Sequence, residues 1–355
     1  MADQPVPAGL IASDGSLRSR HDLLLVDLDG VVYLGAEPIP GAADALGEAR
    51  AAGLRVIFVT NNASRPPGAV AEQLTGLGVS AHASEVMTSA VAAAGILAGE
   101  LDAGAAVLAV GGPGVADALT AVGLRPVSSA EDRPAAVLQG FGPEVGWRAL
   151  AEASVALRAG ARWVATNDDK TLPSPRGPLP GNGSLVAALR TATGLHPQVI
   201  GKPAPALFGA ALRAGAGKRP LVIGDRLDTD IAGARAAGLP SLLVLSGVST
   251  AADLLASDPA SRPNYLGRDL RALGIDHPGV RVDGGLATCG RARAHRTTGR
   301  PAVDEADGPP ATAGPDRLDG LRALCALAWS EAGGDRLPDD RISEYDEALH
   351  QLGFD

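Results

Sequence analysis

Cysteine, lysine and aromatic residues are all scarce in this chain of 355 residues. The two cysteines, Cys289 and Cys325, are too few for a disulfide framework and lack the spacing of a zinc site, so we treat both as structural. Arginine supplies nearly all of the positive charge, because the only lysines are Lys170, Lys202 and Lys218. Each of these lysines is therefore a candidate for a functional role.

Long apolar runs and basic clusters are also missing. No run approaches the roughly 18 residues of a membrane span, and the N-terminal stretch MADQPVPAGLIASDGSLRSRHD lacks the apolar region of a secretory signal. The net charge is -9, and no cluster of lysine and arginine is interleaved with aromatic residues, which argues against nucleic acid as a partner. We expect a cytoplasmic protein without a membrane span that binds a small charged molecule at a local site.

What is present is a repeated alternation of strand-like and helix-like stretches. The hydrophobic content of 46% indicates a globular protein, and the length suggests two or three domains. From His21 to about Val248 the strand-like runs are LLLVDL, RVIFVT, AAVLAV, AAVLQG, RWVAT, QVIG, LVIGD and SLLVL. Alanine-rich amphipathic stretches separate them, including a helix expected over residues 41–52. This pattern predicts an α/β fold with a doubly wound, Rossmann-like parallel sheet.

Changes in composition predict how the domains are organised. We expect a core formed by residues 1–87 and 197–275, with an inserted α/β domain at 88–196 that has its own sheet. The loop NDDKTLPSPRGPLPGNGS in that insertion is too rich in proline and glycine for regular structure. Residues 276–355 are expected to form a small α+β extension, with a mobile segment at 291–315 and helices over about 316–332 and 339–352.

Polar side chains follow four of the predicted strands. Parallel strands deliver ligand-binding residues at their carboxyl ends, so we expect these side chains to meet at one site. They are Asp27 and Asp29 after the first run, Thr60, Asn61 and Asn62 after the second, Lys202 before a proline-led helix, and Asp225 and Asp230 after LVIG. Acids, a hydroxyl, amides and one lysine suit a divalent cation and a phosphoryl group.

The residue types indicate a covalent route. Asp27 and Asp225 can supply the two carboxylates that Mg²⁺ typically takes from a protein. Asp27 can attack a phosphoryl group to give an aspartyl-phosphate, and Lys202 offsets the repulsion between the two anions. Thr60 and Asn61 can donate hydrogen bonds to phosphoryl oxygens. Asp29 can serve as acid and then base, and Gly30 permits a sharp turn beside it.

The motifs DLDGVV, TNNAS, GKP and GDRLDTDI, in this order, resemble those of the haloacid dehalogenase superfamily of phosphatases. The large insertion between the second and third motifs resembles the type IIA branch, which includes phosphoglycolate and nitrophenyl phosphatases. The resemblance implies Asp27 as nucleophile and metal ligand, and Asp29 as acid/base and as ligand through its main-chain carbonyl. It implies Asp225 as a further ligand, Lys202 on the phosphoryl group, and Asp230 orienting Lys202 or a metal-bound water.

The insertion corresponds to the C2-type cap of this branch, which covers the site and sets specificity. The segment VATNDDK resembles a cap segment whose residue after the aspartate, here Lys170, reaches the substrate. In PGNGSLVAAL a turn containing Asn182 precedes a helix. The first amides of such a helix can contact an anion. Members of this branch often pair through their caps, so the resemblance also implies a homodimer through the cap.

The whole chain, including its extension, resembles actinobacterial glycerol 3-phosphate phosphatases. This implies a Mg²⁺-dependent phosphomonoester hydrolase for glycerol 3-phosphate, in glycerophospholipid recycling. The alternatives are 2-phosphoglycolate or another small phosphate such as nitrophenyl phosphate. A mutase is disfavoured, because the cap offers few arginines for a second phosphate. The alternative of another class is a binding or regulatory protein that acts through its C-terminal unit.

Overall fold

The computed structural model describes residues 9–172, 174, 176–305 and 318–354. The chain divides into two compact units. The first combines residues up to Val56 with residues from Ala216 onward, and the second is Ile57–Gly215. Among the described residues, no helix is long and apolar enough to cross a membrane. The domain boundaries at 87/88 and 196/197 stay a prediction.

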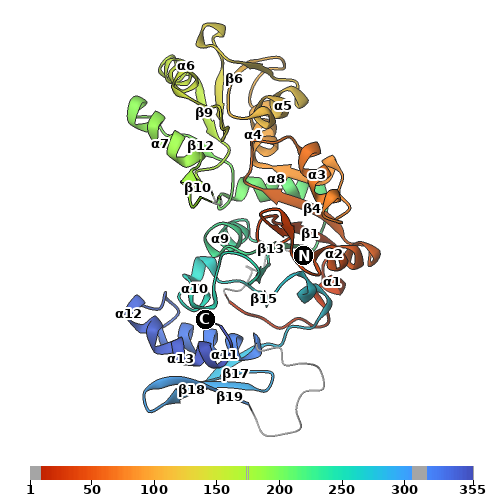
Figure 1. Ribbon diagram of the computed structural model, residues 1–355, viewed down its shortest axis with the longest axis vertical. Coiled ribbons are helices and arrows are strands. Elements are labelled where there is room, and N and C mark those ends of the chain that lie inside the picture. The colour runs from red at the N-terminus through yellow and green to blue at the C-terminus, as the bar shows by residue number, and fades with distance from the viewer. Residues whose placement is uncertain (1–8, 173, 175, 306–317, 355) are drawn as a thin grey trace. The chain divides into compact units, whose positions relative to one another are not determined.

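The first unit contains a parallel sheet with the order β15-β14-β13-β1 (Figure 1). The strands are β1 (Leu23–Val26), β13 (Pro220–Gly224), β14 (Ser241–Val244) and β15 (Tyr265–Gly267). All four residues of β1 are buried, as expected for a strand covered on both faces. The helices around this sheet are α1 (Leu17–Arg20), α2 (Ala42–Ala51), α9 (Ala232–Ala236) and α10 (Ala251–Leu255). The expected helix over residues 41–52 is confirmed as α2.

Strand order changes direction at β1. From β13 the chain adds β14 and then β15 on one side of β1. Strand β4 (Arg55–Thr60) begins on the other side, where the Arg55 N–H donates to the Asp22 carbonyl at 3.1 Å. The first two residues of β4 belong to the first unit and the others to the second. The gap between the ends of β1 and β13 is therefore a topological switch point, the usual ligand site of such sheets.

The second unit has a parallel sheet of its own, with the order β12-β9-β8-β6-β7. The strands are β6 (Ala106–Val110), β7 (Arg125–Val127), β8 (Ala136–Gln139), β9 (Arg162–Ala165) and β12 (Gln198–Val199). The end of β4 pairs in parallel with β5 (Val86–Thr88). The helices of this unit are α3 (Pro67–Gly76), α4 (Ser89–Ala98), α5 (Pro113–Ala121), α6 (Trp147–Arg158), α7 (Asn182–Thr193) and α8 (Pro205–Gly215). The predicted α/β fold with two parallel sheets is confirmed.

The sequence prediction misses short strands. Strands β5 and β7 have three residues each, too few for a clear hydrophobic pattern. The proline-rich loop after β9 was expected to lack regular structure, and this is wrong at two places. Strands β10 (Thr171–Leu172) and β11 (Leu179–Pro180) form an antiparallel pair, because the chain folds back on itself there.

The C-terminal extension is an antiparallel sheet packed against one long helix. The sheet has the order β16-β17-β18-β19, from β16 (Val280–Asp283), β17 (Leu286–Cys289), β18 (Ala292–Thr297) and β19 (Arg300–Glu305). The expected mobile segment at 291–315 is thus wrong for β18 and β19. In β18 the buried Ala292 and Ala294 alternate with more exposed residues. The rest of that segment, 306–315, lies outside the described residues.

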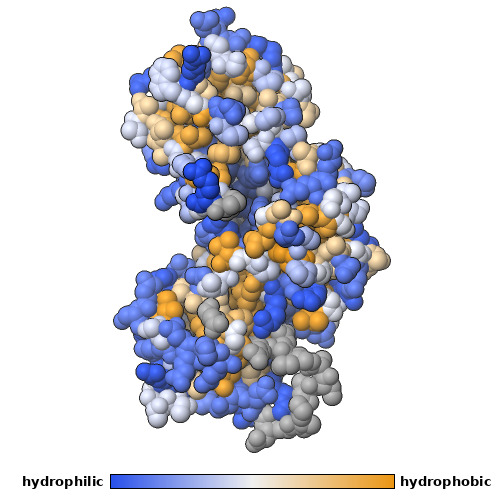
Figure 2. Space-filling model, viewed as in Figure 1, coloured by the Kyte–Doolittle hydropathy of each residue, from blue (hydrophilic) through white to orange (hydrophobic). Residues whose placement is uncertain are grey.

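The extension shares a hydrophobic core with the parallel sheet of its unit. Helix α11 (Leu318–Glu331) confirms the helix expected over residues 316–332. Its Leu321 and Leu324 belong to the same buried cluster as Leu243 of β14 and Leu266 of β15. The helix expected over 339–352 is divided into α12 (Asp339–Ile342), a 3₁₀ turn and α13 (Asp346–Gln351). The surface around α12 and α13 is mostly hydrophilic on the face seen in Figure 2.

Candidate active site

Two aspartates lie at the carboxyl ends of neighbouring strands of the first unit. Strands β1 and β13 are parallel and in register, with Val26 opposite Ile223. Asp27 follows β1, and its N–H donates to the Ile223 carbonyl at 2.9 Å. Asp225 directly follows Gly224, the last residue of β13. The sheet itself therefore brings these two carboxylates together at the switch point.

Asp230 joins them to make a group of three carboxylates. One oxygen from each of Asp27, Asp225 and Asp230 lies within 4.8 Å of the other two. A π-helical turn, Leu227–Ile231, carries Asp230 inward, and its Oδ2 accepts a hydrogen bond from the Arg226 N–H at 3.1 Å. Asp225 and Asp230 are each only 1% exposed, so their negative charges need a cation nearby.

The donor set fits magnesium. Three carboxylates converge at the end of a sheet, and Mg²⁺ prefers hard oxygen ligands of this kind. The neighbouring main chain also leaves space there. Gly30 has φ +80°, and a Cβ on it would lie 2.3 Å from Asp225 Oδ2. Gly30 is thus needed for the room beside Asp225 as well as for the turn that the sequence predicts.

A loop that the sequence analysis overlooked holds Asp225 in place. The Val248 N–H donates to Asp225 Oδ2 at 2.7 Å, and the Ser249 N–H donates to the Asp225 carbonyl at 3.1 Å. In the same loop, Ser246 Oγ donates to the Gly30 carbonyl at 2.7 Å. The sequence does contain a signal for this loop, because it directly follows the strand-like run SLLVL and therefore lies at the carboxyl end of a further strand.

Asp29 lies in a more open place than Asp27. Its side chain is exposed, and its backbone forms an isolated bridge with Tyr33. The Gly30 N–H donates to the Tyr33 carbonyl at 2.7 Å, which closes the turn. An exposed carboxyl can exchange protons with solvent, as an acid/base group must. Between Asp225 and Asp230 in the chain, hydrogen bonds from Arg226 hold the pKa of Asp228 below its ordinary value.

In the second unit, Thr60 and Asn62 form a tight turn at the end of β4. Thr60 is 4% exposed, and its Oγ1 accepts a hydrogen bond from the Asn62 N–H at 3.1 Å. Asn62 is exposed, and its Oδ1 accepts hydrogen bonds from Ser64 N–H and Oγ at 2.9 and 2.8 Å. The side-chain carbonyl of Asn62 therefore stabilises the turn.

Asn61 and Lys202 are joined by two hydrogen bonds within that unit. The Lys202 N–H donates to Asn61 Oδ1 at 2.8 Å, and Asn61 Nδ2 donates to the Lys202 carbonyl at 3.0 Å. Asn61 Nδ2 also donates to the Asp169 carboxylate, at 3.2 Å to Oδ2. Lys202 is 5% exposed, and its Nζ donates to the Val59 carbonyl at 3.4 Å. These contacts use both hydrogens of the Asn61 amide, so the predicted hydrogen bond from Asn61 to a phosphoryl oxygen falls to its main-chain N–H.

The two predicted residues of the inserted domain have different surroundings. The side chain of Lys170 is exposed. Asn182 is 1% exposed, and its Nδ2 donates to the Asn167 carbonyl at 2.7 Å. At the start of α7, the N–H groups of Gly181 and Gly183 donate at 2.9 Å to the carbonyls of Lys170 and Asp169. These two amides are committed to the main chain, so they are not the anion contact that the sequence suggested.

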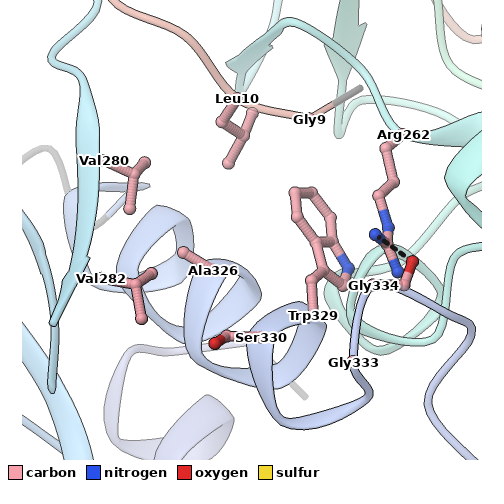
Figure 3. A pocket seen from close by; sticks show the side chains of 10 residues that line it. All are labelled: Gly9, Leu10, Arg262, Val280, Val282, Ala326, Trp329, Ser330, Gly333 and Gly334. Atoms are coloured by element: carbon pink, nitrogen blue, oxygen red, sulfur yellow. Dashed lines mark hydrogen bonds between the residues drawn. The ribbon is translucent and has the colours of Figure 1, made fainter. Parts of the chain in front are cut away.

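A pocket of about 430 Å³ lies elsewhere in the first unit, beside α11 (Figure 3). Leu10, Val280, Val282 and Trp329 provide much of its lining. Arg262 stacks on the Trp329 ring at 4.7 Å, and its Nη1 donates to the Gly334 carbonyl at 2.9 Å. None of the residues that line this pocket belongs to the four motifs.

The chain belongs to the haloacid dehalogenase-like hydrolase family. Residues 24–125 match the family described as haloacid dehalogenase-like hydrolase, and residues 199–273 match one described as HAD-hydrolase-like. Together these matches include all four motifs. The carboxylate group at the end of β1 and β13 lies in the matched parts of the chain.

Three comparisons place the chain within this family. It is 54% identical over 283 residues to D-glycerol 3-phosphate phosphatase of Mycobacterium tuberculosis, covering 77% of this chain and 79% of that one. The crystal structure of a glycerol phosphate phosphatase from M. tuberculosis with magnesium superposes with a TM-score of 0.81. It is 46% identical and covers 95% of this chain and 99% of that chain. A p-nitrophenyl phosphatase from Archaeoglobus fulgidus has a TM-score of 0.67 and 29% identity, covering 72% and 98%.

Proposed function

We propose that this protein is a Mg²⁺-dependent phosphomonoester hydrolase with glycerol 3-phosphate as its favoured substrate. The observation that carries the proposal is the group of Asp27, Asp225 and Asp230 oxygens within 4.8 Å of one another at the switch point. The identity of 54% to a D-glycerol 3-phosphate phosphatase supports the choice of substrate. The similarity to a structure that holds magnesium supports the choice of ion.

The proposed chemistry has two steps. In the first, an Asp27 carboxylate oxygen attacks phosphorus and the bond to the leaving oxygen breaks, while Asp29 gives its proton to the departing alcohol. In the second, Asp29 removes a proton from the water that attacks the aspartyl-phosphate, which releases phosphate and restores Asp27. Mg²⁺ held by Asp27, Asp225 and the Asp29 carbonyl would neutralise charge on the phosphoryl oxygens. Asp230 supports this group from the π-helical turn.

For the residues of the second unit, the proposed roles are based on the motifs they belong to and on their burial and hydrogen bonds. Lys202 is proposed to offset the phosphoryl charge, and burial of its side chain strengthens any ion pair that it makes. Thr60 and the main chain near Asn61 and Asn62 are proposed to donate hydrogen bonds to the same group. In the inserted domain, exposed Lys170 is proposed as a substrate contact. Asn182, which is buried, is proposed to support the segment at Asn167.

The test is a panel of phosphomonoesters ranked by kcat/KM, with Mg²⁺ and with a chelator. Glycerol 3-phosphate is expected to rank first, ahead of 2-phosphoglycolate and nitrophenyl phosphate, and the chelator is expected to abolish turnover. Asp27→Asn should lower kcat by at least about 10³-fold, because the nucleophile is lost. Asp44→Asn, an exposed aspartate on α2, should leave kcat unchanged. Comparable activity of Asp27→Asn and the native chain would rule out the covalent route.

Two further expectations belong to this proposal. A homodimer through the inserted domain is proposed, because Trp147 and Val155 of α6 are 80% and 58% exposed, which is unusual for large apolar side chains on one helix.

The cytoplasmic location stays a prediction. Phosphomonoesters of this size carry charge and do not cross membranes unaided, so both substrate and enzyme are expected in the same compartment.

A further inference from the structure

The Asn61 side chain binds both main-chain polar groups of Lys202, the N–H and the carbonyl. The Asn61 carboxamide accepts from the Lys202 N–H at 2.8 Å and donates to the Lys202 carbonyl at 3.0 Å. This pair of bonds fixes the main chain at Lys202 from both sides. Because the lysine side chain is 5% exposed, a displacement of its main chain also moves the ammonium group.

Asp169 reinforces the orientation of the Asn61 carboxamide. One Nδ2 hydrogen is used on the Lys202 carbonyl, and the other is directed at the Asp169 carboxylate, at 3.2 and 3.4 Å from its oxygens. If the carboxamide were turned over, Oδ1 would face the Asp169 carboxylate and Nδ2 would face the Lys202 N–H. Oδ1 would also face the Lys202 carbonyl, so all three contacts would be repulsive. The carboxylate therefore adds to the preference that the Lys202 N–H and carbonyl already impose, and it stabilises the orientation that binds Lys202.

Asp169 is itself held beside Asn61 by the segment that follows β9. Asn167 Nδ2 donates to the Asn61 carbonyl at 2.8 Å, and the Asp169 N–H donates to Asn167 Oδ1 at 3.2 Å. The Gly201 N–H donates to the Thr166 carbonyl at 2.8 Å. The segment 166–169 thus contacts the main chain within both motifs of its unit, at Asn61 and at Gly201.

We propose that Asp169 is a positioning residue for Lys202 and acts through the Asn61 carboxamide. This inference rests on the proposed function, in which Lys202 offsets the phosphoryl charge. A lysine displaced by a fraction of an ångström stabilises that charge less, since catalysis depends on preorganised groups. The segment next to Lys170 therefore contributes to turnover as well as to substrate contact.

The first test compares two adjacent aspartates. Asp169→Ala is expected to lower kcat by about 10- to 100-fold with a smaller change in KM, because the transition state needs Lys202 more than the ground state does. Asp168→Ala removes the same charge from an exposed neighbour and is expected to keep kcat within about twofold, as surface substitutions do. Asp169→Asn retains one acceptor oxygen and should recover most of the lost kcat. Equal losses for Asp168→Ala and Asp169→Ala would contradict the proposal.

The second test asks whether Asp169 acts through Asn61. In the Asn61→Ala background, Asp169→Ala is expected to lower kcat no further, because the carboxamide that it orients is already gone. Losses that multiply would show that Asp169 acts independently, and would overturn the inference.

A third measurement does not depend on activity. Hydrogen exchange of the Lys202 amide is expected to be faster in Asp169→Ala and Asn61→Ala than in the native chain, and unchanged in Asp168→Ala. If the native chain hydrolyses no phosphomonoester, the proposed function fails while the exchange data still decide the positioning. If the enzyme is active and the Lys202 amide exchanges equally slowly in Asp169→Ala, the positioning inference fails alone.

Discussion

Gly30 shows how one residue can be required for two physical reasons. Its φ of +80° disfavours any residue with a Cβ, and a Cβ there would also lie 2.3 Å from Asp225 Oδ2. The φ of Gly35 is +62°, but nothing lies within 4 Å of the Cβ position there. The two glycines separate the cost of the backbone conformation from that of crowding.

We predict that Gly30→Ala and Gly35→Ala differ in magnesium dependence rather than in backbone strain. The positive φ should lower the free energy of unfolding by about 1 kcal/mol in both, and the crowding against Asp225 should add to the loss in Gly30→Ala. Only Gly30→Ala should raise the Mg²⁺ concentration needed for half-maximal activity, by about tenfold, since it displaces the Asp225 carboxylate. Magnesium titrations of kcat and thermal unfolding measure the two effects. An equal Mg²⁺ requirement in both variants would contradict the role of Gly30 beside Asp225.

Among the elements, the packing of helix α11 shows whether the C-terminal extension is a separate module or part of its unit. Its buried residues, including Leu321 and Leu324, form one cluster with Leu243 and Leu266 of the parallel sheet. A module that merely binds a partner would present an apolar face outward, whereas α11 turns that face to the unit that carries the carboxylates. The extension is therefore part of the core of its unit.

We predict that Leu324→Ala destabilises the whole first unit. Leu324 is 0% exposed, and removal of a fully buried leucine side chain costs about 2–5 kcal/mol. Ser330→Ala, at an exposed position of the same helix, should change the free energy of unfolding by less than about 0.5 kcal/mol. Urea unfolding, with hydrogen exchange on β13 and β14, gives the measurement. An extension that unfolds while these strands keep their protection would disprove the shared core.

At the scale of the whole molecule, the question is the number of copies in the functional particle. Trp147 is 80% exposed and Val155, two turns further along α6, is 58% exposed. Tryptophan in particular is enriched at the buried centre of protein interfaces. Ile275 of the first unit is 43% exposed and offers a comparison outside the inserted domain.

We predict that the native chain has the molar mass of a dimer in solution and that Trp147→Ser weakens the dimer by at least about tenfold, as loss of an aromatic anchor does. Ile275→Ser should leave the dimer intact. Sedimentation equilibrium over a range of concentrations gives both dissociation constants. A native chain that sediments as a monomer throughout would refute the proposed pairing.

Several features could be predicted from local pattern because local physics produces them. The apolar runs form buried strands since only a strand covered on both faces has no polar side, as for Leu23–Val26. The face of α2 follows from its helical spacing, and its Ala42, Ala45, Leu46 and Ala49 are buried. The four motifs predict which residue types meet a phosphoryl group, because carboxylates, a lysine and hydrogen-bond donors are what that chemistry needs.

Other features could not be predicted, because they depend on contacts between distant parts of the chain. The sequence shows Asn61 and Asp169 as polar residues after two strands, yet only the fold makes one the clamp of Lys202 and the other its orienting partner. Strands β18 and β19 have a composition typical of a linker, and they form a sheet because α11 packs against Ala292 and Ala294 of β18 and Val303 of β19. The sequence by itself determined the chemistry available at the strand ends. Only the tertiary structure decided which of those side chains hold one another in place, since hydrogen bonds between distant segments exist only in the folded chain.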